Sequence, residues 1–465
     1  MAISLATDVP ELVATELADT FRGTITGPSD PGYDDARAVY NGMIDRRPGL
    51  IARCADVADV ITAVNAARRH DLLVAVRGGG HNAGGLGVCD GGLVIDLSAM
   101  RGIHVDPTLR TVRVEGGCTW GDVDHATHAF GLAVPSGIIS TTGVGGLTLG
   151  GGLGHLSRRH GLTIDSLLAA DVVLADGTLV TASEEQNPEL FWALRGGGGN
   201  FGVVTSFVFR AHPVAEIIGG PTLWTMDRAA EVLRFYDEFM KTAPRDLNGF
   251  FAFLTVPPAP PFPEELHLKK MCGVVWCYTG PPEEADAIFA PIAEFGPPAL
   301  HGVQAMPFPA LQSAFDALYP RGHQWYWKAD FVDELSDEAI ERHVRHGAAL
   351  PTLQSTMHLY PIDGAAGDPA PNATAFRYRG SRYGMVIVGV DPDPGLKPEL
   401  VSWARAYWEA VHPYSAGGAY VNMMMHDEGE DRVRASYGDN YDQLLAAKRR
   451  YDPDNRFRVN QNISP

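Results

Sequence analysis

The residues best suited to bind a ligand lie in one glycine-rich segment, Arg77-Gly78-Gly79-Gly80-His81-Asn82, which follows a short apolar run at 73–76. Five glycines fall within nine residues here. Consecutive glycines allow backbone N–H groups to converge on one anion, and Arg77 would add positive charge. A tight strand-to-helix turn is the simpler alternative, but it requires neither so many glycines nor a histidine. The segment therefore predicts a phosphate-binding loop.

Two further glycine clusters occupy 137–161 and 196–202. Glycine is costly in helices and strands, so we expect no regular element over 137–161. We expect its backbone at 143–154 to lie against a flat ring or a pyrophosphate. Gly197, Gly199 and Gly202 match the dinucleotide fingerprint as a string, but an apolar strand follows them instead of a helix, which excludes a Rossmann site.

Hydrophobic periodicity predicts a mixture of helices and strands, and the fold class is α+β. The composition changes after residue 212, where glycine becomes sparser and aromatic residues more common. The predicted helices are 55–70, 120–129, 187–194 and one within 329–350; the predicted strands are 73–76, 93–97, 111–114 and 203–209, with a hairpin at 171–180.

Composition excludes several classes of function. Lys plus Arg is 37 and Asp plus Glu is 56, and the net charge of −19 argues against a nucleic-acid partner. No apolar run approaches the ~20 residues that span a membrane. The N-terminus lacks a basic segment followed by an apolar one, so we predict a cytoplasmic protein. Five cysteines form no disulfide framework, and no metal-site spacing is present, so we predict no metal.

The chain resembles the FAD-linked oxidases of the berberine bridge enzyme type, within the vanillyl-alcohol oxidase superfamily. The resemblance covers essentially the whole chain in order, although about 215–370 matches loosely. It is carried by the segments RGGGHNAGG, GGLVIDLSAM, TTGVGGLTLGGGLGHLSRRHGLTIDSL, ALRGGGGNFGVVTSF and YDPDNRFRVNQNI.

The resemblance implies a two-domain FAD-binding fold of the PCMH type. Residues 1–212 would form the FAD-binding domain, and 213–412 would form a substrate-binding domain, an antiparallel sheet backed by helices. Residues 413–465 would return to the FAD domain. The active site would lie in the cleft between the two domains.

The resemblance also implies the FAD site. His81 matches the histidine that bonds covalently to a ring methyl of the flavin. Ile139 stands where many members carry a second, cysteine link, and Cys118 lies outside that motif, so we expect attachment through His81 only. The implied FAD-binding residues are Arg77, Gly78, Gly79, Gly80, His81, Asn82, Ser136, Thr141, Thr142, Gly145, Gly146, Gly150, Gly151, Gly154, His155, Val204, Asn460 and Asn462.

The catalytic base is less clearly marked. Many members carry Y-x-N-Y, which reads Tyr420-Val-Asn-Met423 here, and the Glu or Gln of plant-type members falls near Val386. Tyr420 is the first candidate, with Tyr378 or His358 as alternatives. A tyrosine acts as a base only where partners stabilise its phenolate. Tyr420 could instead be a packing residue.

The implied activity is FAD-dependent oxidation of an alcohol (a sugar, an aromatic alcohol or a secondary metabolite) or an amine. A hydride would pass to the flavin, and dioxygen would be reduced to hydrogen peroxide, so the partners are a small-molecule substrate and dioxygen. Thr142 stands where members control dioxygen access, and it leaves open a dehydrogenase that uses another electron acceptor. A non-catalytic flavoprotein that binds a metabolite is the second alternative.

Overall fold

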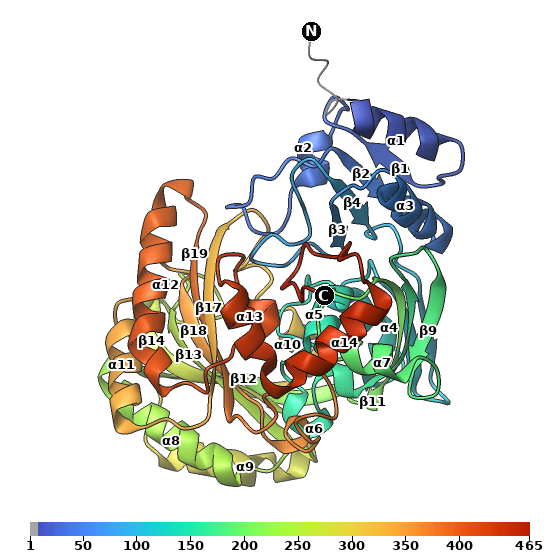
Figure 1. The fold of residues 1–465 in the computed structure, drawn as a ribbon. Coiled ribbons are helices and arrows are strands. Elements are labelled where there is room, and N and C mark those ends of the chain that lie inside the picture. The colour runs from blue at the N-terminus through green and yellow to red at the C-terminus, as the bar shows by residue number, and fades with distance from the viewer. Residues whose placement is uncertain (1–7) are drawn as a thin grey trace.

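The structure, a computed structural model, describes residues 8–465 and arranges them around three large β-sheets (Figure 1). The first sheet has four strands in the order β1-β2-β4-β3, and β2 and β3 both run parallel to β4. Its elements are α1 (Asp8–Ala18), β1 (Thr24–Thr26), α2 (Tyr33–Arg37), β2 (Leu50–Arg53), α3 (Val57–Arg69), β3 (Val74–Arg77) and β4 (Leu93–Asp96).

The second sheet has five antiparallel strands in the order β5-β6-β10-β8-β9. Its strands are β5 (Ile103–Asp106), β6 (Thr111–Glu115), β8 (Leu167–Val173), β9 (Leu179–Ser183) and β10 (Val203–Arg210). The helices of this region are α4 (Trp120–His128), α5 (Val144–Gly150), α6 (Ser157–His160) and α7 (Pro188–Leu194), and β7 (Leu132–Ala133) pairs with β11 (His212–Pro213).

The third sheet is antiparallel throughout and follows the order β15-β12-β14-β13-β18-β19-β17, with β16 also on β12. Its strands are β12 (Glu216–Thr225), β13 (Leu247–Thr255), β14 (Lys270–Tyr278), β15 (Leu300–His301), β16 (Gln304–Pro307), β17 (Gln324–Val332), β18 (Thr356–Pro361) and β19 (Tyr383–Asp391).

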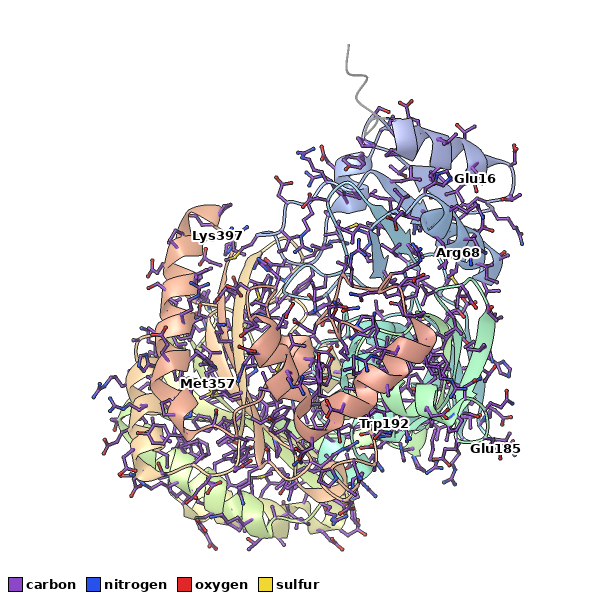
Figure 2. The ribbon with its side chains drawn as sticks, in the orientation of Figure 1. Glu16, Arg68, Glu185, Trp192, Met357 and Lys397 are labelled. Carbon is purple, nitrogen blue, oxygen red and sulfur yellow. The ribbon has the colours of Figure 1, made fainter. Side chains whose placement is uncertain are left out.

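Helices cover one face of this third sheet, and α12 and α11 lie along its outer side in Figure 1. Met357 of β18 is fully buried in the core beneath them (Figure 2). The other face of the sheet packs toward the first half of the chain. The covering helices are α8 (Ala229–Thr242), α9 (Ala285–Glu294), α11 (Asp337–Gly347) and α12 (Lys397–Val411), and α10 (Phe308–Gln312) packs against α4.

The C-terminal segment returns to the first half of the chain through α13 (Glu430–Tyr437) and α14 (Tyr441–Tyr451), and α14 packs on α7. A buried lysine fixes its end. Lys448 Nζ contacts Asp452 at 2.6 Å and donates to the carbonyls of Asn200 and Phe457, each at 2.9 Å. The glycine cluster at 196–202 and the residues after 456 are thereby held together.

The α+β class and the antiparallel third sheet are confirmed. The division of the chain near 212 and 412 stays a prediction; the first position lies in β11 (His212–Pro213) and the second in a 3₁₀ turn, His412–Tyr414, directly after α12. The expectation of no regular element over 137–161 was wrong, because α5 and α6 form there. Val144, Thr148 and Leu149 of α5 are buried, and packing of such a face stabilises a helix despite its glycines.

Within residues 8–465, no helix combines the length and apolar character needed to cross a membrane.

Candidate functional site

The predicted phosphate loop begins where β3 ends. Parallel pairing places Arg77 beside Asp96, and their side chains form a buried ion pair with Nη2 and Oδ2 2.8 Å apart. Arg77 also donates to the carbonyl of Ala36 at 2.6 Å. The sequence interpretation gave Arg77 a free charge for phosphate, but Asp96 offsets that charge. The contacts of Arg77 instead hold the base of the loop.

Glycines let the loops at 77–82 and 137–143 meet backbone to backbone. A Cβ on Gly79 would lie 2.7 Å from the Cα of Gly143, which only glycine avoids. Gly80 has a φ of 67° and turns the chain toward His81. At Gly146 and Gly199, by contrast, a Cβ would have no heavy atom within 4 Å. Both of these glycines line a cavity, so their faces are open to a ligand.

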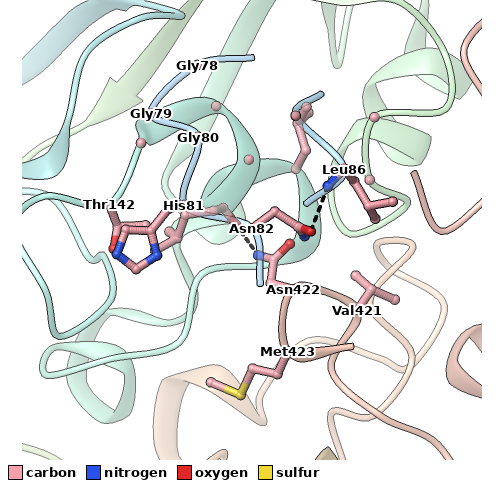
Figure 3. Close-up of a pocket in the computed structure, with 18 of the residues that line it drawn as sticks. Gly78, Gly79, Gly80, His81, Asn82, Leu86, Thr142, Val421, Asn422 and Met423 are labelled. Atoms are coloured by element: carbon pink, nitrogen blue, oxygen red, sulfur yellow. Dashed lines mark hydrogen bonds between the residues drawn. The ribbon is translucent and has the colours of Figure 1, made fainter. Parts of the chain in front are cut away.

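The cavity has a volume of about 320 Å³ and is lined by the glycine loops and by residues of the third sheet. Figure 3 shows the part of its lining around Gly78–Gly80, His81 and Asn82. Among its described lining residues, Arg77 is the only one with a permanently charged side chain. Asn82 closes the loop beside it, because its Oδ1 accepts from the Leu86 N–H at 3.2 Å. The sequence-predicted residues that line the cavity are Arg77, Gly78, Gly79, Gly80, His81, Asn82, Thr142, Gly145, Gly146, Val204, His358, Tyr420 and Asn460.

The structure places the other sequence-predicted residues away from the cavity lining. His155 is buried near Phe250, with ring centroids 6.0 Å apart, and burial lowers its pKa to about 3. Tyr378 stacks on Phe331 and donates to the carbonyl of Ala435 at 2.8 Å. The remaining residues outside the lining are Ser136, Thr141, Gly150, Gly151, Gly154 and Asn462.

Three of these glycines have a packing role instead. A Cβ on Gly150 would lie 2.2 Å from Asn422 Oδ1, and one on Gly151 would lie 3.2 Å from the Tyr420 ring. A Cβ on Gly154 would lie 2.2 Å from the carbonyl oxygen of residue 136 and 2.4 Å from that of residue 137. Glycines at the end of α5 thus admit the C-terminal segment to the cavity, and this contact between distant segments has no local sequence signal.

His81 projects into the cavity from the phosphate loop (Figure 3). Its ring stacks on Tyr40 with a centroid distance of 3.7 Å and an interplanar angle of 20°. Its Nε2 is buried and has no hydrogen-bond partner among the described residues. Burial lowers the pKa of His81 to about 4, so the ring is neutral near pH 7.

Tyr420 contacts the chain just after the C-terminal end of α5, at Gly152, and precedes a 3₁₀ turn, Val421–Met423. Its hydroxyl oxygen accepts from the Gly152 N–H at 2.7 Å and from Asn422 Nδ2 at 2.8 Å. Burial raises the pKa of Tyr420 to about 12, and these two hydrogen bonds act against that rise. The Tyr420 proton has no acceptor within residues 8–465, so it is free to bond a ligand.

The third sheet supplies the far wall of the cavity. His358 of β18 lies there, and its Nδ1 is 2.6 Å from the hydroxyl of Tyr360. Burial lowers the pKa of His358 to about 3. The cavity also includes residues that the sequence interpretation missed: Tyr319, Trp325, Trp327, Thr356, Tyr360, Asn422, Gln461, Gly198 and Gly199. Alternation along the strand 324–332 could have shown that the side chains of Trp325 and Trp327 share one face. It could not have shown which residues of the neighbouring strands lie beside them.

All five cysteines lie within the described part of the chain as buried free thiols, and none lines the cavity. Burial raises the pKa of Cys118 to about 12, so it is not a reactive thiolate. Ile139 and Thr142 line the cavity at the positions discussed above. No thiol is therefore available at the cavity wall.

Comparison with known proteins identifies this class of site. Residues 48–183 match the FAD binding domain family, and residues 419–464 match the family described as berberine and berberine like. The first matched segment contains the glycine clusters at 77–85 and 137–161, and the second contains Tyr420. The fold is that of PCMH-type FAD-binding oxidases.

Individual relatives match along nearly their whole length. An FAD-linked oxidoreductase of Dictyostelium discoideum is 32% identical over 97% of both chains. The (R)-6-hydroxynicotine oxidase of Paenarthrobacter nicotinovorans is 29% identical over 97% of this chain and 98% of its own. The crystal structure of 6-hydroxy-D-nicotine oxidase from Arthrobacter nicotinovorans superposes with a TM-score of 0.83 at 26% identity, covering 96% of this chain and 98% of that one. The chain belongs to the berberine bridge enzyme-like family of FAD-linked oxidoreductases.

The comparisons therefore show an enzyme, which removes the non-catalytic flavoprotein as an alternative.

Proposed function

We propose that this oxidoreductase removes two electrons from a small-molecule alcohol or amine, with FAD attached through His81 and dioxygen reduced to hydrogen peroxide. The observation that carries the proposal is the position of Tyr420. Its oxygen, held by two N–H donors, lines the same cavity as the glycine loops. The oxidases named among the relatives support the assignment.

The described residues fit FAD. Gly146 and Gly199 present bare backbone to the cavity, where a side chain would fill the space of a flat ring. Backbone N–H groups at Gly78–Gly80 would face the pyrophosphate. Asn460 donates through Nδ2 to the carbonyl of Gly199 at 3.0 Å, which leaves its buried Oδ1 for a ring donor.

The state of the His81 ring supports the proposed attachment. A neutral imidazole keeps a lone pair for bond formation, and the low pKa of His81 keeps it neutral. Stacking on Tyr40 limits rotation of the ring. Because no cysteine lines the cavity, we propose a single covalent link.

Tyr420 is proposed as the base. The substrate loses two hydrogens: Tyr420 accepts the one on oxygen or nitrogen as a proton, while the C–H hydrogen leaves with its electron pair. FAD, when bound, would supply the acceptor for that pair and the redox link to dioxygen, so that the two electrons and the two protons lost by the substrate end in hydrogen peroxide. The N–H groups of Gly152 and Asn422 stabilise the phenolate form.

The two alternative bases are weaker candidates. His358 lines the cavity, but a group with a pKa near 3 has little affinity for a proton at neutral pH. Tyr378 lies outside the lining and its proton is donated to Ala435. We therefore assign proton removal to Tyr420.

The test measures oxygen uptake and peroxide formation by the purified yellow protein with a panel of aromatic alcohols, amines and sugars. We expect one peroxide per molecule of product. A substrate that reduces the flavin under anaerobic conditions, but whose turnover requires an added dye and proceeds without peroxide, would assign a dehydrogenase instead. A protein whose flavin no member of the panel reduces would contradict the proposal.

A further inference from the structure

The wall of the cavity opposite the glycine loops is one face of three neighbouring strands. In antiparallel pairs, residues directly opposite one another point to the same face. Val388 pairs with Thr356 on one side and with Trp327 on the other. Val386 pairs with His358, two residues along on the same face. These five residues all line the cavity.

This wall carries no charge that could pair with a charged ligand. Arg77 is the only permanently charged lining residue among those described, and Asp96 already binds it at 2.8 Å on the phosphate-loop side. His358 is buried and neutral. A carboxylate or phosphate placed against this wall would lose its hydration without gaining a partner, which is strongly unfavourable.

The wall also has few free hydrogen-bonding groups. The Thr356 hydroxyl donates to the carbonyl of Phe253 at 2.7 Å, and the Tyr360 hydroxyl is bonded to His358 Nδ1. The indole nitrogens of Trp325 and Trp327 have no partner within residues 8–465, but both are buried beneath the surface of the wall. An oligosaccharide would bury many hydroxyls here without partners.

The same wall offers aromatic surface. The ring centroids of Tyr319 and Trp325 are 5.4 Å apart, and Trp327 meets Trp325 edge to face at 5.9 Å. Such surfaces favour flat aromatic ligands. Resting on the proposed oxidation, we infer that the substrate is an uncharged molecule built on an aromatic ring, with few hydrogen-bonding substituents on the part that faces this wall.

Binding to the flavin-loaded protein tests this inference without turnover, through the change in flavin absorption. The probes share one reacting group: 4-methoxybenzyl alcohol is neutral, 4-(hydroxymethyl)benzoate is anionic and 4-(aminomethyl)benzyl alcohol is cationic, while cellobiose represents sugars. We expect the neutral aromatic to have a Kd at least ~100-fold lower than the other three. Equal or tighter binding of the anion, the cation or the sugar would overturn the inference.

A gain of anion binding provides a second test. Val388→Lys places an ammonium on the cavity wall, and the Kd ratio of anion to neutral probe should fall at least ~10-fold. Leu109→Lys adds the same charge at a side chain 71% exposed outside the cavity and should leave the ratio unchanged. An unchanged ratio in a flavin-loaded Val388→Lys protein would contradict the inference. If that variant loses its flavin, the order of Kd values of the four probes with the wild-type protein decides whether the inference holds.

The two proposals fail in different ways. A reversed order of binding overturns the substrate class alone. Tight binding of the neutral alcohol without flavin reduction or peroxide overturns the proposed oxidation and leaves the substrate class supported.

Discussion

Replacing Tyr420 with phenylalanine removes one oxygen from the proposed base and keeps the ring that packs at the end of α5. The Gly152 N–H then loses its acceptor, while Asn422 Nδ2 keeps its bond to the carbonyl of Leu147 at 3.0 Å. One unsatisfied buried donor costs about 1–3 kcal/mol of stability. A protein of this size tolerates that loss, so the variant should fold and hold its flavin.

The effect on the reaction should be larger and should depend on pH. With a pKa of about 12, roughly one Tyr420 in 10⁴ is ionised at pH 8. The base acts in its deprotonated form, so flavin reduction should become faster as pH rises, about tenfold per unit between pH 6 and 10. Tyr420→Phe should lose this slope and reduce its flavin ~10²–10⁴-fold more slowly.

Anaerobic stopped-flow absorbance, which follows the flavin band with an active substrate, measures both quantities. Tyr437→Phe is the matched control, because it removes a hydroxyl from another tyrosine that lines the cavity and donates to Gly197 at 3.2 Å. It should stay within a few-fold of wild type. If Tyr420→Phe reduces its flavin within about threefold of wild type and keeps the slope, Tyr420 is a packing residue.

Three further results are expected. Gly146→Ala adds a methyl group in open space within a helix, so the free energy of unfolding of the apoprotein in urea should rise by up to ~1 kcal/mol while FAD binds more weakly. Tighter FAD binding would refute the proposal that the backbone at Gly146 lies against the cofactor. Asp96→Asn leaves the Arg77 charge buried and unpaired, and unfolding should show a loss of about 3–5 kcal/mol, whereas a loss below about 1 kcal/mol would show that the pair does not support the loop. Tyr40→Ala should lower the fraction of flavin retained after acid precipitation while Tyr40→Phe preserves it; equal retention in both would show that stacking does not position His81.

The local elements of the fold could be predicted because their signals are local. Apolar residues at helical spacing within 57–69 form α3, and a short apolar run forms β3. The helix α5 could not be predicted in this way. Its segment, VGGLTLG, has poor helix propensity, and its stability comes from burying Val144 and Leu149 in a core assembled from distant segments.

The candidate site divides in the same way. The loop at 77–82 could be predicted to form part of a site because a run of glycines at the end of a strand is unusual, and its residues line the cavity. The glycines at 150–154 gave the same signal but pack against Tyr420, Asn422 and the carbonyls at 136–137. Tyr40 stacks on a residue 41 positions later, and no pattern near it in the sequence indicates that contact.

The cavity wall that the third sheet forms could not be predicted from the sequence for a related reason. Alternation shows that Trp325 and Trp327 share a face, but the strand that pairs with theirs, β19, lies about 60 residues further along the chain. Which face meets the glycine loops depends on how the sheet packs as a whole.

Mass spectrometry of a tryptic digest tests the central claim most directly, that this cavity holds FAD through His81 alone. The expected flavin-bearing peptide is 78–101, which also contains Cys89, so fragmentation must place the flavin on the histidine. The His81→Ala protein should still bind FAD but release all of it on denaturation. Flavin on His81 alone supports the account; flavin on Cys89 or on the peptide that contains Cys118, or complete release from the wild-type protein, would contradict it.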